Sequence, residues 1–561
     1  MMKQKDNMPR TAVDLEVSPD LGVETSQCQA ISEEVSRQLA DLLHVLGIPG
    51  VPAVKFATMR NNDKLLRLVV NGEQCLYPNE LLWRIQSFMN NTLLAQIPIS
   101  EVIKAAKANH VEFLSLSCLE IIKQQPAVLF GIDQAAAYQE LLSMTNTQSG
   151  VWPSSPDWLL PIIHKVLNLK FSIADWQVVA NVLCESLMKG RSSDEVAEDL
   201  IATFHPEVVE IHVSKDYLRQ LTTNDTVSGR DKFSMVRDGL FYELGIKYPD
   251  FCFVPVENFN AETFSFKINN ITTLPRTGLP QDRLLVNDTP DRLENFSGKP
   301  AINPVYWNEC SHIDSKYQAD AVSIGLTTWN SIEYMTLCMA AELKKYGICF
   351  VSRRSVQYEL DQVALAFPAL VKAVLSRFSL DSITRMIRNL AAEEISVRNL
   401  RLILEWLLDY DYIVSDSAQF IIFDNRLPLH EKPSAHQIIH PANLTSFVRT
   451  GLKRYISHKY TRGGNTLVVY LLDPQIERLL PKCDSDSMPL NDDTRNRILK
   501  AVRQELREMQ PSVVILTTID VRASLRNILA PEFPKLPVVA YQELSPDMNI
   551  QPIARRISWE K

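Results

Sequence analysis

Apolar and polar residues alternate in two similar segments of the chain. The segments are Val13–Leu21 and Val209–Tyr217, which lie 196 positions apart and begin with apolar residues at every second position. Alternation with a period of two is typical of a strand that is buried on one face. We therefore expect a strand at the start of each segment.

A similar series of elements follows each strand. In both series a helical pattern runs into a Leu-Gly-Ile triplet, and a strand-like run and a proline turn before a leucine pair come next. The first series is Val35–Leu46, 46–48, Lys64–Val70 and Tyr77–Leu82, and the second is Met235–Leu244, 244–246, Thr263–Ile268 and Leu279–Leu285. A fixed order at nearly constant spacing indicates an internal repeat.

The repeat extends further along the chain. Phe171–Val179 resembles Ile395–Ile403, but the offset there has grown to 224. A segment of about 26 residues has therefore been lost from the first copy or gained by the second, as the change in offset shows. We interpret the chain as a tandem duplication with divergence, in preference to chance similarity of amphipathic segments.

The last stretch has no counterpart in copy one. We expect Asn443 to cap a helix. On this helix, apolar residues share one face, namely Leu444, Phe447, Val448, Leu452 and Ile456. Strand-like and helical patterns then alternate, as 466–472, 493–509, 512–516, 521–529 and 537–541. This alternation predicts a small α/β domain.

The predicted fold class is a multidomain α/β and α+β protein. It comprises two copies of a split α/β subdomain plus a helical subdomain, and then a C-terminal α/β subdomain. The expected limits are a flexible N-terminus at 1–10, copy one at 11–126 and 127–205, copy two at 206–345 and 346–432 with an insertion at about 288–322, and the C-terminal subdomain at 433–561.

Composition narrows the class of protein. The 561 residues carry a net charge of −8, with 46% hydrophobic and 22% charged residues, which are ordinary globular values. The longest apolar runs are too short for a membrane helix, and no secretory signal follows Met1. Nine scattered cysteines fit a reducing compartment. We expect a soluble, cytoplasmic protein with no transmembrane segment.

Four stretches resemble one protein family. They are Tyr77–Leu82, Ile395–Glu405, Asp520–Arg526 and Phe533–Leu544. They are similar to the "L-Y-P-G-x-L-L", "I-R-D-L-R-T-I-L-E", "D-x-R-x-x-L-R" and "F-P-x-L-P-V-L-S-Y-x-E" motifs of the FHIPEP (FlhA/LcrD) family. Members are export-gate proteins of flagellar and virulence type III secretion systems. The resemblance is strong from about 206 to 548 and weak from 10 to 200.

The resemblance implies a non-enzymatic, protein-binding role in type III export. The family's cytosolic half has four subdomains, assembles as a ring and docks chaperone–substrate complexes. The partners implied here are chaperones, export substrates or gate subunits, with a ring or other homo-oligomer. The implied location is the cytoplasm, peripheral to the inner-membrane export apparatus. This chain departs in having two cytosolic-type copies, of which copy one lacks the C-terminal subdomain, and no membrane half. The resemblance does not distinguish a flagellar from a virulence-associated system.

The family's docking motif is altered in this chain. Where the family has acidic-Pro-Ala-Phe-Gly, this sequence has Lys299-Pro300-Ala301-Ile302-Asn303. The charge is thereby reversed, and an aromatic anchor is replaced by an aliphatic one. The partner-binding residues implied by the resemblance are Lys299, Ile302, Tyr306, Trp307 and Ile332, and the helical subdomain from Ser352 to Leu408 is a second expected docking surface.

Other chemistry has weaker support. His430, His436 and His440 form the densest histidine group, which we interpret as linker residues and not as a zinc site. A basic run, which includes Arg449, Lys453 and Arg454, is either the polar face of a helix or a nucleic-acid footprint. A nucleic-acid-binding or regulatory module is therefore the alternative function. We expect no cofactor, no metal and no catalytic residues, although an enzyme that uses dispersed residues stays open.

Overall fold

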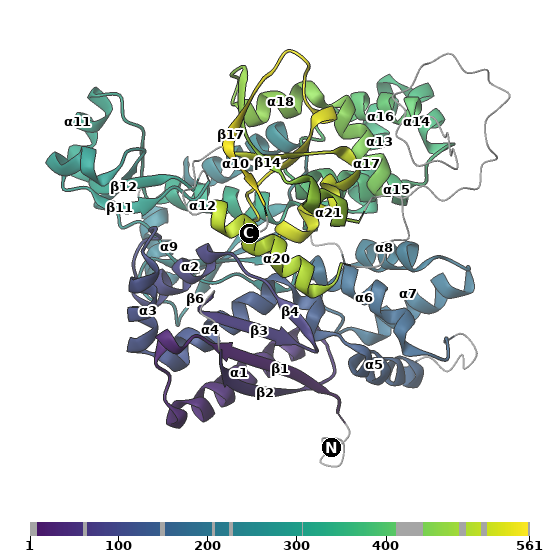
Figure 1. Cartoon of the computed structure of the whole chain (residues 1–561), viewed down its shortest axis with the longest axis horizontal. Coiled ribbons are helices and arrows are strands. Elements are labelled where there is room, and N and C mark those ends of the chain that lie inside the picture. Colours follow the sequence, from purple (N-terminus) through teal and green to yellow (C-terminus); the bar gives the residue numbers. More distant parts are fainter. Residues whose placement is uncertain are drawn as a thin grey trace. The chain divides into compact units, whose positions relative to one another are not determined.

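The computed structural model describes residues 8–59, 64–145, 152–204, 208–223, 228–305, 307–410, 441–481, 490–506 and 513–558. The chain divides into two compact units, each treated by itself below. Unit 1 is Met1–Phe241 with Lys247–Ser352, and unit 2 is Tyr242–Ile246 with Arg353–Lys561. Figure 1 follows the elements from purple to yellow along the chain. The finer six-part division predicted above stays a proposal.

Copy one begins with a four-stranded sheet in the order β2-β1-β3-β4. β1 runs parallel to β2 and antiparallel to β3. The expected alternation is confirmed, because Val13, Leu15 and Val17 are at most 1% exposed while their neighbours face outward. α1 packs against β2 and α4. The elements are β1 (Arg10–Val17), α1 (Thr25–Leu46), β2 (Val51–Thr58), β3 (Leu66–Val70), β4 (Glu73–Cys75), α2 (Asn79–Met89), α3 (Ile99–Ala108) and α4 (His110–Gln124).

Copy two has the same sheet. Its order is β6-β5-β7-β8, with β9 also on β7, and β5 is again parallel to β6 and antiparallel to β7. The shared order and strand directions confirm the duplication. The elements are β5 (Val208–Ser214), α9 (Lys215–Thr223), α10 (Ser228–Leu244), β6 (Asp250–Val256), β7 (Thr263–Ile268), β8 (Ile271–Thr272), β9 (Arg276–Thr277) and α12 (Ser331–Lys345).

The two Leu-Gly-Ile triplets have the same structural role. Each ends a helix with a glycine in the left-handed region, at φ 73° for Gly47 and 74° for Gly245. The leucine carbonyl before each glycine accepts a 2.8 Å hydrogen bond from its own copy's helical subdomain, donated by Ile173 in copy one and Val397 in copy two. A side chain on either glycine would collide with that subdomain's backbone. Close approach therefore requires glycine at both positions.

The helical subdomains match residue by residue where they meet these glycines. Asp175 caps α7 and Asn399 caps α16, and Lys170 and Glu394 both have a left-handed backbone, at φ 67° and 54°. Asn399 is therefore the cap of the second helix, in the position equivalent to Asp175. Copy one contributes α5 (Ile132–Thr145), α6 (Leu159–Asn168), α7 (Trp176–Met188) and α8 (Ser193–Thr203); copy two contributes α13 (Arg353–Ala366), α14 (Pro368–Leu375), α15 (Leu380–Ala392) and α16 (Leu400–Asp409).

One proposed match within the repeat is wrong. Pro78 immediately precedes helix α2, whereas Pro280 leads into strand β10. Apolar pairs after a proline occur in both kinds of element, so the pattern did not distinguish them. β10 instead opens the insertion sheet, ordered β11-β12-β10-β13, which with α11 forms the small lobe at the upper left of Figure 1. Its elements are β10 (Arg283–Val286), β11 (Lys299–Ile302), β12 (Glu309–Asp314), α11 (Gln318–Ser323) and β13 (Thr328–Trp329).

The C-terminal subdomain is the predicted α/β domain. Its sheet, β16-β15-β14-β17, is parallel throughout. Asn443 does not begin the first helix, which starts at Pro441, and the expected single helix is interrupted at Leu452. The elements are α17 (Pro441–Gly451), α18 (Lys453–Thr461), β14 (Thr466–Leu472), α19 (Pro474–Leu479), α20 (Asp492–Glu505), β15 (Val514–Thr517), α21 (Ile519–Leu529), β16 (Val538–Ala540) and β17 (Asn549–Ile557).

Candidate partner-binding surface

The predicted partner-binding residues lie in or beside the insertion of copy two. β11 pairs antiparallel with β12, so that Lys299 lies opposite His312. Lys299 is exposed at the start of β11, whereas Ile302 at its end is only 2% exposed. Burial, Arg283 and Lys299 lower the pKa of His312 to about 4. The imidazole is therefore neutral near pH 7, and Lys299 supplies the exposed charge of this strand.

The turn after β11 is built by Asn303. Its side-chain oxygen accepts a 3.0 Å hydrogen bond from the amide of Val305, and its carbonyl accepts one of 2.8 Å from the amide of Trp307. Trp307 has φ 56°, a left-handed conformation that is unusual for a bulky residue. Its side chain is half-buried, so part of the indole faces solvent. Tyr306 lies outside the described residues.

The outer edge of β11 is closed to an added strand. The amide of Ile302 donates a 2.8 Å hydrogen bond to the carbonyl of Leu94 in copy one. Alternate residues of a strand direct their amides to the same side. Pro300 therefore occupies the neighbouring outward position and has no amide hydrogen to donate. A partner at this edge must be recognised through side chains. Lys299, Pro300, Asn308 and Glu309 are exposed on the hairpin, and Trp307 is half-buried.

Leu94 was missed by the sequence reasoning. It lies between α2 and α3 and, like Leu93, is 9% exposed. Two adjacent leucines in a polar loop are a signal of burial, but the sequence offers no means of pairing them with β11. Copy one therefore contributes to the surface expected from copy two alone.

Ile332 is set away from the hairpin. It is the second residue of α12, which is capped by Asn330 and packs against β10 and β13. β13 and β11 are opposite edges of the insertion sheet. The structure therefore brings Lys299, Ile302 and Trp307 together in one hairpin and leaves Ile332, which is 7% exposed, beside the other edge.

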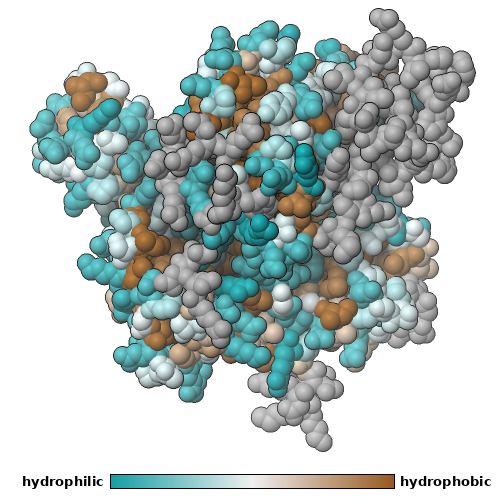
Figure 2. Space-filling model, in the orientation of Figure 1, coloured by the Kyte–Doolittle hydropathy of each residue, from teal (hydrophilic) through white to brown (hydrophobic). Residues whose placement is uncertain are grey.

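Hydrophobic side chains also gather over the tip of the insertion lobe (Figure 2). Val322 in α11 is 56% exposed, and Ile324, just after the helix, is 62% exposed. The core of the lobe is separate from these residues and consists of Leu284, Val286, Leu293, Ile313 and Ala321. The lobe thus presents apolar side chains to solvent in addition to its own packed core.

The basic run considered for nucleic acid loses its first member. Arg449 in unit 2 is 0% exposed and forms two hydrogen bonds with Glu543, at 2.6 and 2.8 Å. Lys459 in the same run donates to the backbone carbonyls of Glu393 and Glu394. A side chain without exposed surface cannot contact phosphate in the folded protein. The prediction that Arg449 belongs to a nucleic-acid footprint is therefore wrong.

Metal binding has no candidate in the described ranges. Those ranges contain no group of three or more His, Cys, Asp or Glu side chains that could hold an ion. His430, His436 and His440 lie outside the described residues. Likewise, none of the helices that the structure describes is both long enough and apolar enough to span a bilayer.

Comparison with known proteins gives a consistent match. The FHIPEP family model matches residues 150–549. The low calcium response locus protein D of Yersinia pestis is 24% identical over 378 residues, which is 65% of this chain and 49% of that protein. The flagellar biosynthesis protein FlhA of Bacillus subtilis is 20% identical over 365 residues, 64% of this chain and 50% of that protein. The chain thus spans about half the length of these curated relatives.

Solved structures agree on the fold. The CdsV protein of Chlamydia pneumoniae is 26% identical, with a TM-score of 0.52, and the match covers 61% of this chain and 96% of that one. A second structure contains the C. pneumoniae CdsV and CdsO protein complex; it is 27% identical, with a TM-score of 0.53, and the match covers 62% of this chain and 96% of that one.

Proposed function

The chain belongs to the FHIPEP family, and on that premise we propose that it is a non-enzymatic, protein-binding component of a type III export system. Its proposed partners are export substrates, their chaperones or subunits of the export gate. Its proposed place is the cytoplasm, at the inner-membrane export apparatus. Family membership supports the general role in secretion, and the β11–β12 hairpin supports the binding role.

The hairpin is the observation that carries this proposal. It presents an exposed ammonium group at Lys299 and a partly exposed indole at Trp307, both on a backbone fixed by hydrogen bonds. Tryptophan is among the residues that contribute most to the affinity of protein interfaces. A charged group on the same hairpin adds selectivity, because like charges repel and opposite charges attract.

The partner chemistry differs from that implied by the family motif. The cation at Lys299 favours an acidic side chain on the partner, where an acid in the family motif favours a basic one. Ile302 is buried and hydrogen-bonded to copy one, so it does not serve as an exposed anchor. We therefore propose an acidic segment of a chaperone, substrate or gate subunit as the ligand of the hairpin.

The test uses the full chain and purified candidate partners from the same cell. Calorimetric titration should show binding to at least one chaperone–substrate complex or soluble gate domain. Trp307→Ala and Lys299→Glu should each weaken that binding by about tenfold or more, which is the scale expected for an interface anchor. Trp176→Ala is the matched control, because Trp176 is an exposed tryptophan of copy one, at 43% exposure.

Two results would contradict the proposal. The first is failure to bind any gate subunit, chaperone or substrate. The second is binding that both hairpin variants leave unchanged, which would place the surface elsewhere in the chain. The solution mass of the chain, alone and with partners, tests the proposed ring or homo-oligomer separately. A monomer under all conditions would exclude ring formation by this chain alone.

A further inference from the structure

One continuous segment of copy one reaches across to copy two. It runs from 79 to 108 and comprises α2, a loop and α3, which follow the first sheet where the insertion lobe follows the second. We call this segment the brace. The lobe leaves copy two after β9 and returns to it at α12, and we call these two elements the base of the lobe. The contacts of the brace run in chain order from this base to the hairpin.

The first contact is a buried ion pair. The Nη2 atom of Arg84 in α2 lies 3.1 Å from a carboxylate oxygen of Glu342 in α12. Glu342 is 2% exposed and also binds Arg276 of β9. α4 and α12 are both 15 residues long, and aligning their ends makes Ile121 of copy one the equivalent of Glu342. Because Ile121 is an apolar residue with 0% exposure, the buried carboxylate is a feature of copy two for which copy one supplies a cation.

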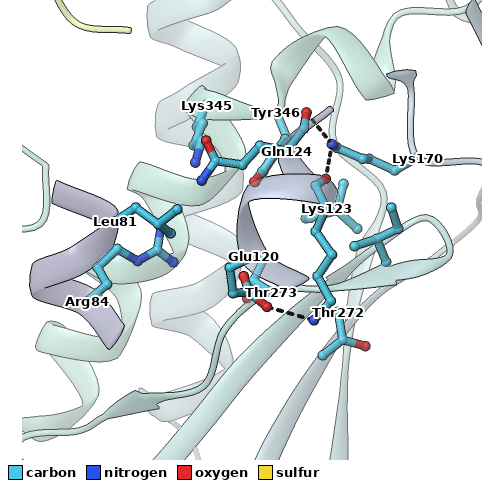
Figure 3. A pocket seen from close by; sticks show the side chains of 12 residues that line it. Leu81, Arg84, Glu120, Lys123, Gln124, Lys170, Thr272, Thr273, Lys345 and Tyr346 are labelled. Carbon is cyan, nitrogen blue, oxygen red and sulfur yellow. Dashed lines mark hydrogen bonds and ion pairs between the residues drawn. The ribbon is translucent and has the colours of Figure 1, made fainter. Parts of the chain in front are cut away.

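Backbone contacts join the two copies beside this ion pair. Arg84 lines a small space together with Lys345 of α12 and Lys170 from the turn after α6 (Figure 3). The carbonyl of Lys170 accepts a 3.0 Å hydrogen bond from the amide of Asn270, in the β7–β8 turn of copy two. The start of the brace is therefore held against copy two by side chains and by backbone.

The next two contacts lie in the loop of the brace. The hydroxyl of Thr277, the last residue of β9, donates a 3.3 Å hydrogen bond to the side-chain oxygen of Asn91. Three residues further along, the carbonyl of Leu94 accepts the 2.8 Å hydrogen bond from the amide of Ile302 in β11. The brace thus extends from the base of the lobe to the first strand of the hairpin.

The insertion lobe is a small body with a hydrophobic core of its own. Short connections, 278–282 before β10 and residue 330 after β13, join it to its base, and β10 and β13 pack on α12. A body attached in this way can rotate about its base. The base holds the lobe near β13, whereas the brace contacts β11, which is the opposite edge of the same sheet. A contact at that edge opposes rotation of the lobe.

We propose that the brace keeps the insertion lobe in one orientation, and that copy one thereby presents the β11–β12 hairpin to its partner. Leu94 is then a positioning residue of the docking surface, since it is buried and acts through β11. A surface held in one orientation binds more tightly than one that adopts several, because only the competent fraction binds. The effect on binding rests on the proposed function, whereas the orientation of the lobe does not.

The first test measures the orientation of the lobe without any partner. Spin labels are attached to the full chain by non-cysteine chemistry at Lys104 of α3, whose side chain is 80% exposed, and at Ser323 of α11, which is exposed. The wild type should give one narrow distribution of label distances. The double variant Leu93→Ser, Leu94→Ser should broaden it, because both leucines are only 9% exposed and their burial keeps the loop in place.

A milder variant keeps every side chain of the loop. Two glycines inserted between Gln96 and Ile97 lengthen the loop and should broaden the same distribution to a smaller extent. The same insertion after Gly190 is the matched control and should leave the distribution unchanged. Gly190 lies in the turn between α7 and α8, and no atom of the described residues lies within 4 Å of the position that its Cβ would take.

Hydrogen exchange distinguishes release of the lobe from its unfolding. The amide of Ile302 donates to the brace, whereas the amide of Asn303 donates to the carbonyl of Asn308 within the hairpin. The double variant should accelerate exchange at Ile302 by about tenfold, the scale of one backbone hydrogen bond. Exchange at Asn303 and in β10 should stay unchanged, because the lobe keeps its own fold.

A partner that binds the wild type provides the last readout. The double variant should bind it about three- to tenfold more weakly, although Lys299 and Trp307 are intact. Three results would overturn the proposal: equal widths of the distance distribution in the wild type and the double variant, faster exchange throughout the lobe, or tighter partner binding by the variant. The last would mean that the loop obstructs docking. If no partner binds, the proposed function fails, while the label distances still decide the role of the brace.

Discussion

Arg449 and Glu543 form a two-point ion pair in the interior of unit 2. The Nε–Oε1 and Nη2–Oε2 distances are 2.6 and 2.8 Å, and both side chains are 0% exposed. Glu393 lies on the other side of Arg449, at 3.2 Å, and also accepts from Arg522 at 2.8 Å. Two of these residues, Arg522 and Glu543, belong to the sequence motifs that resemble the family. Those motifs therefore meet in space as one buried charge cluster.

Removing one partner of this pair should destabilise unit 2 strongly. In Glu543→Ala the buried Arg449 would lose its bidentate acceptor, and the expected cost is about 3–5 kcal/mol. Chemical denaturation, followed by hydrogen exchange in α17 and α21, measures it. The control Glu309→Ala changes an exposed carboxylate and should alter stability by less than about 0.5 kcal/mol. A Glu543→Ala protein as stable as wild type would show that the ion pair is not maintained in solution.

Acid should weaken the same cluster. Burial alone would raise the pKa of Glu393, but the charges of Arg449 and Arg522 outweigh it and hold the pKa at about 2, against an ordinary value of 4.5. Because the folded-state pKa is the lower one, the stabilisation is fully present above pH 4.5 and is lost as the pH falls towards 2. The lost contribution is about 3 kcal/mol.

This pH dependence is measurable by comparison with Glu393→Gln. Denaturation curves of the wild type should show stability decreasing across the window from about pH 4.5 to about 2. The variant should be less stable at neutral pH and have a shallower decrease in that window. Equal slopes for the two proteins would mean that Glu393 is not the group that titrates there.

The family's aromatic anchor should not fit at position 302. Ile302 is 2% exposed, so Ile302→Phe adds volume to a packed site, and we expect a loss of about 1–3 kcal/mol in the free energy of unfolding. Lys299→Asp, on the same strand but exposed, should change stability by less than about 0.5 kcal/mol. Thermal unfolding distinguishes them. An Ile302→Phe protein with unchanged Tm would indicate that this strand end can open.

Gly47 and Gly245, which each contact the helical subdomain of their own copy, should be equally intolerant of a side chain. A Cβ at Gly47 would lie 2.2 Å from Ala174 Cα, and one at Gly245 would lie 2.2 Å from Arg398 N. Each alanine variant must displace backbone, so we expect a cost well above the ~1 kcal/mol of a left-handed alanine. Hydrogen exchange should increase near Ile173 in the first variant and near Val397 in the second.

Gly190→Ala is a control that separates the cost of the left-handed backbone from the cost of a steric collision of the new Cβ. Gly190 has φ 66°, but no atom of the described residues lies within 4 Å of the position that its Cβ would take. It should therefore show only the cost of the left-handed conformation, about 1 kcal/mol. If the three alanine variants lose the same stability, the close approaches at Gly47 and Gly245 contribute nothing.

The duplication could be predicted from the sequence because the patterns that indicate it are local. Glycine after a helix and alternation in β1 and β5 each depend on neighbouring residues only. β2 was missed because it lacks a fully buried face, and β17 because it contains a proline and two adjacent arginines. Local patterns of that kind resemble loops.

The candidate site was only partly predictable for a different reason. The resemblance located the hairpin, but the hydrogen bond from Ile302 to Leu94 joins residues of different copies. Likewise Arg449 resembles a surface cation until Glu543, 94 positions further along, is known to meet it. Contacts at such separations follow from the assembled fold and have no signature within a short window of sequence.

The matched turns at Lys170 and Glu394 have a consequence for folding. A chain with two similar folds can pair the helical subdomain of one copy with the partner surface of the other. Here the equivalent positions carry opposite charges: Lys170 meets helix-end carbonyls in copy one, whereas the turn at Glu394 is held by the ammonium of Lys459. An exchanged subdomain would bring Lys170 towards Lys459. The like charges of Lys170 and Lys459 would then oppose such a mispairing of the two halves.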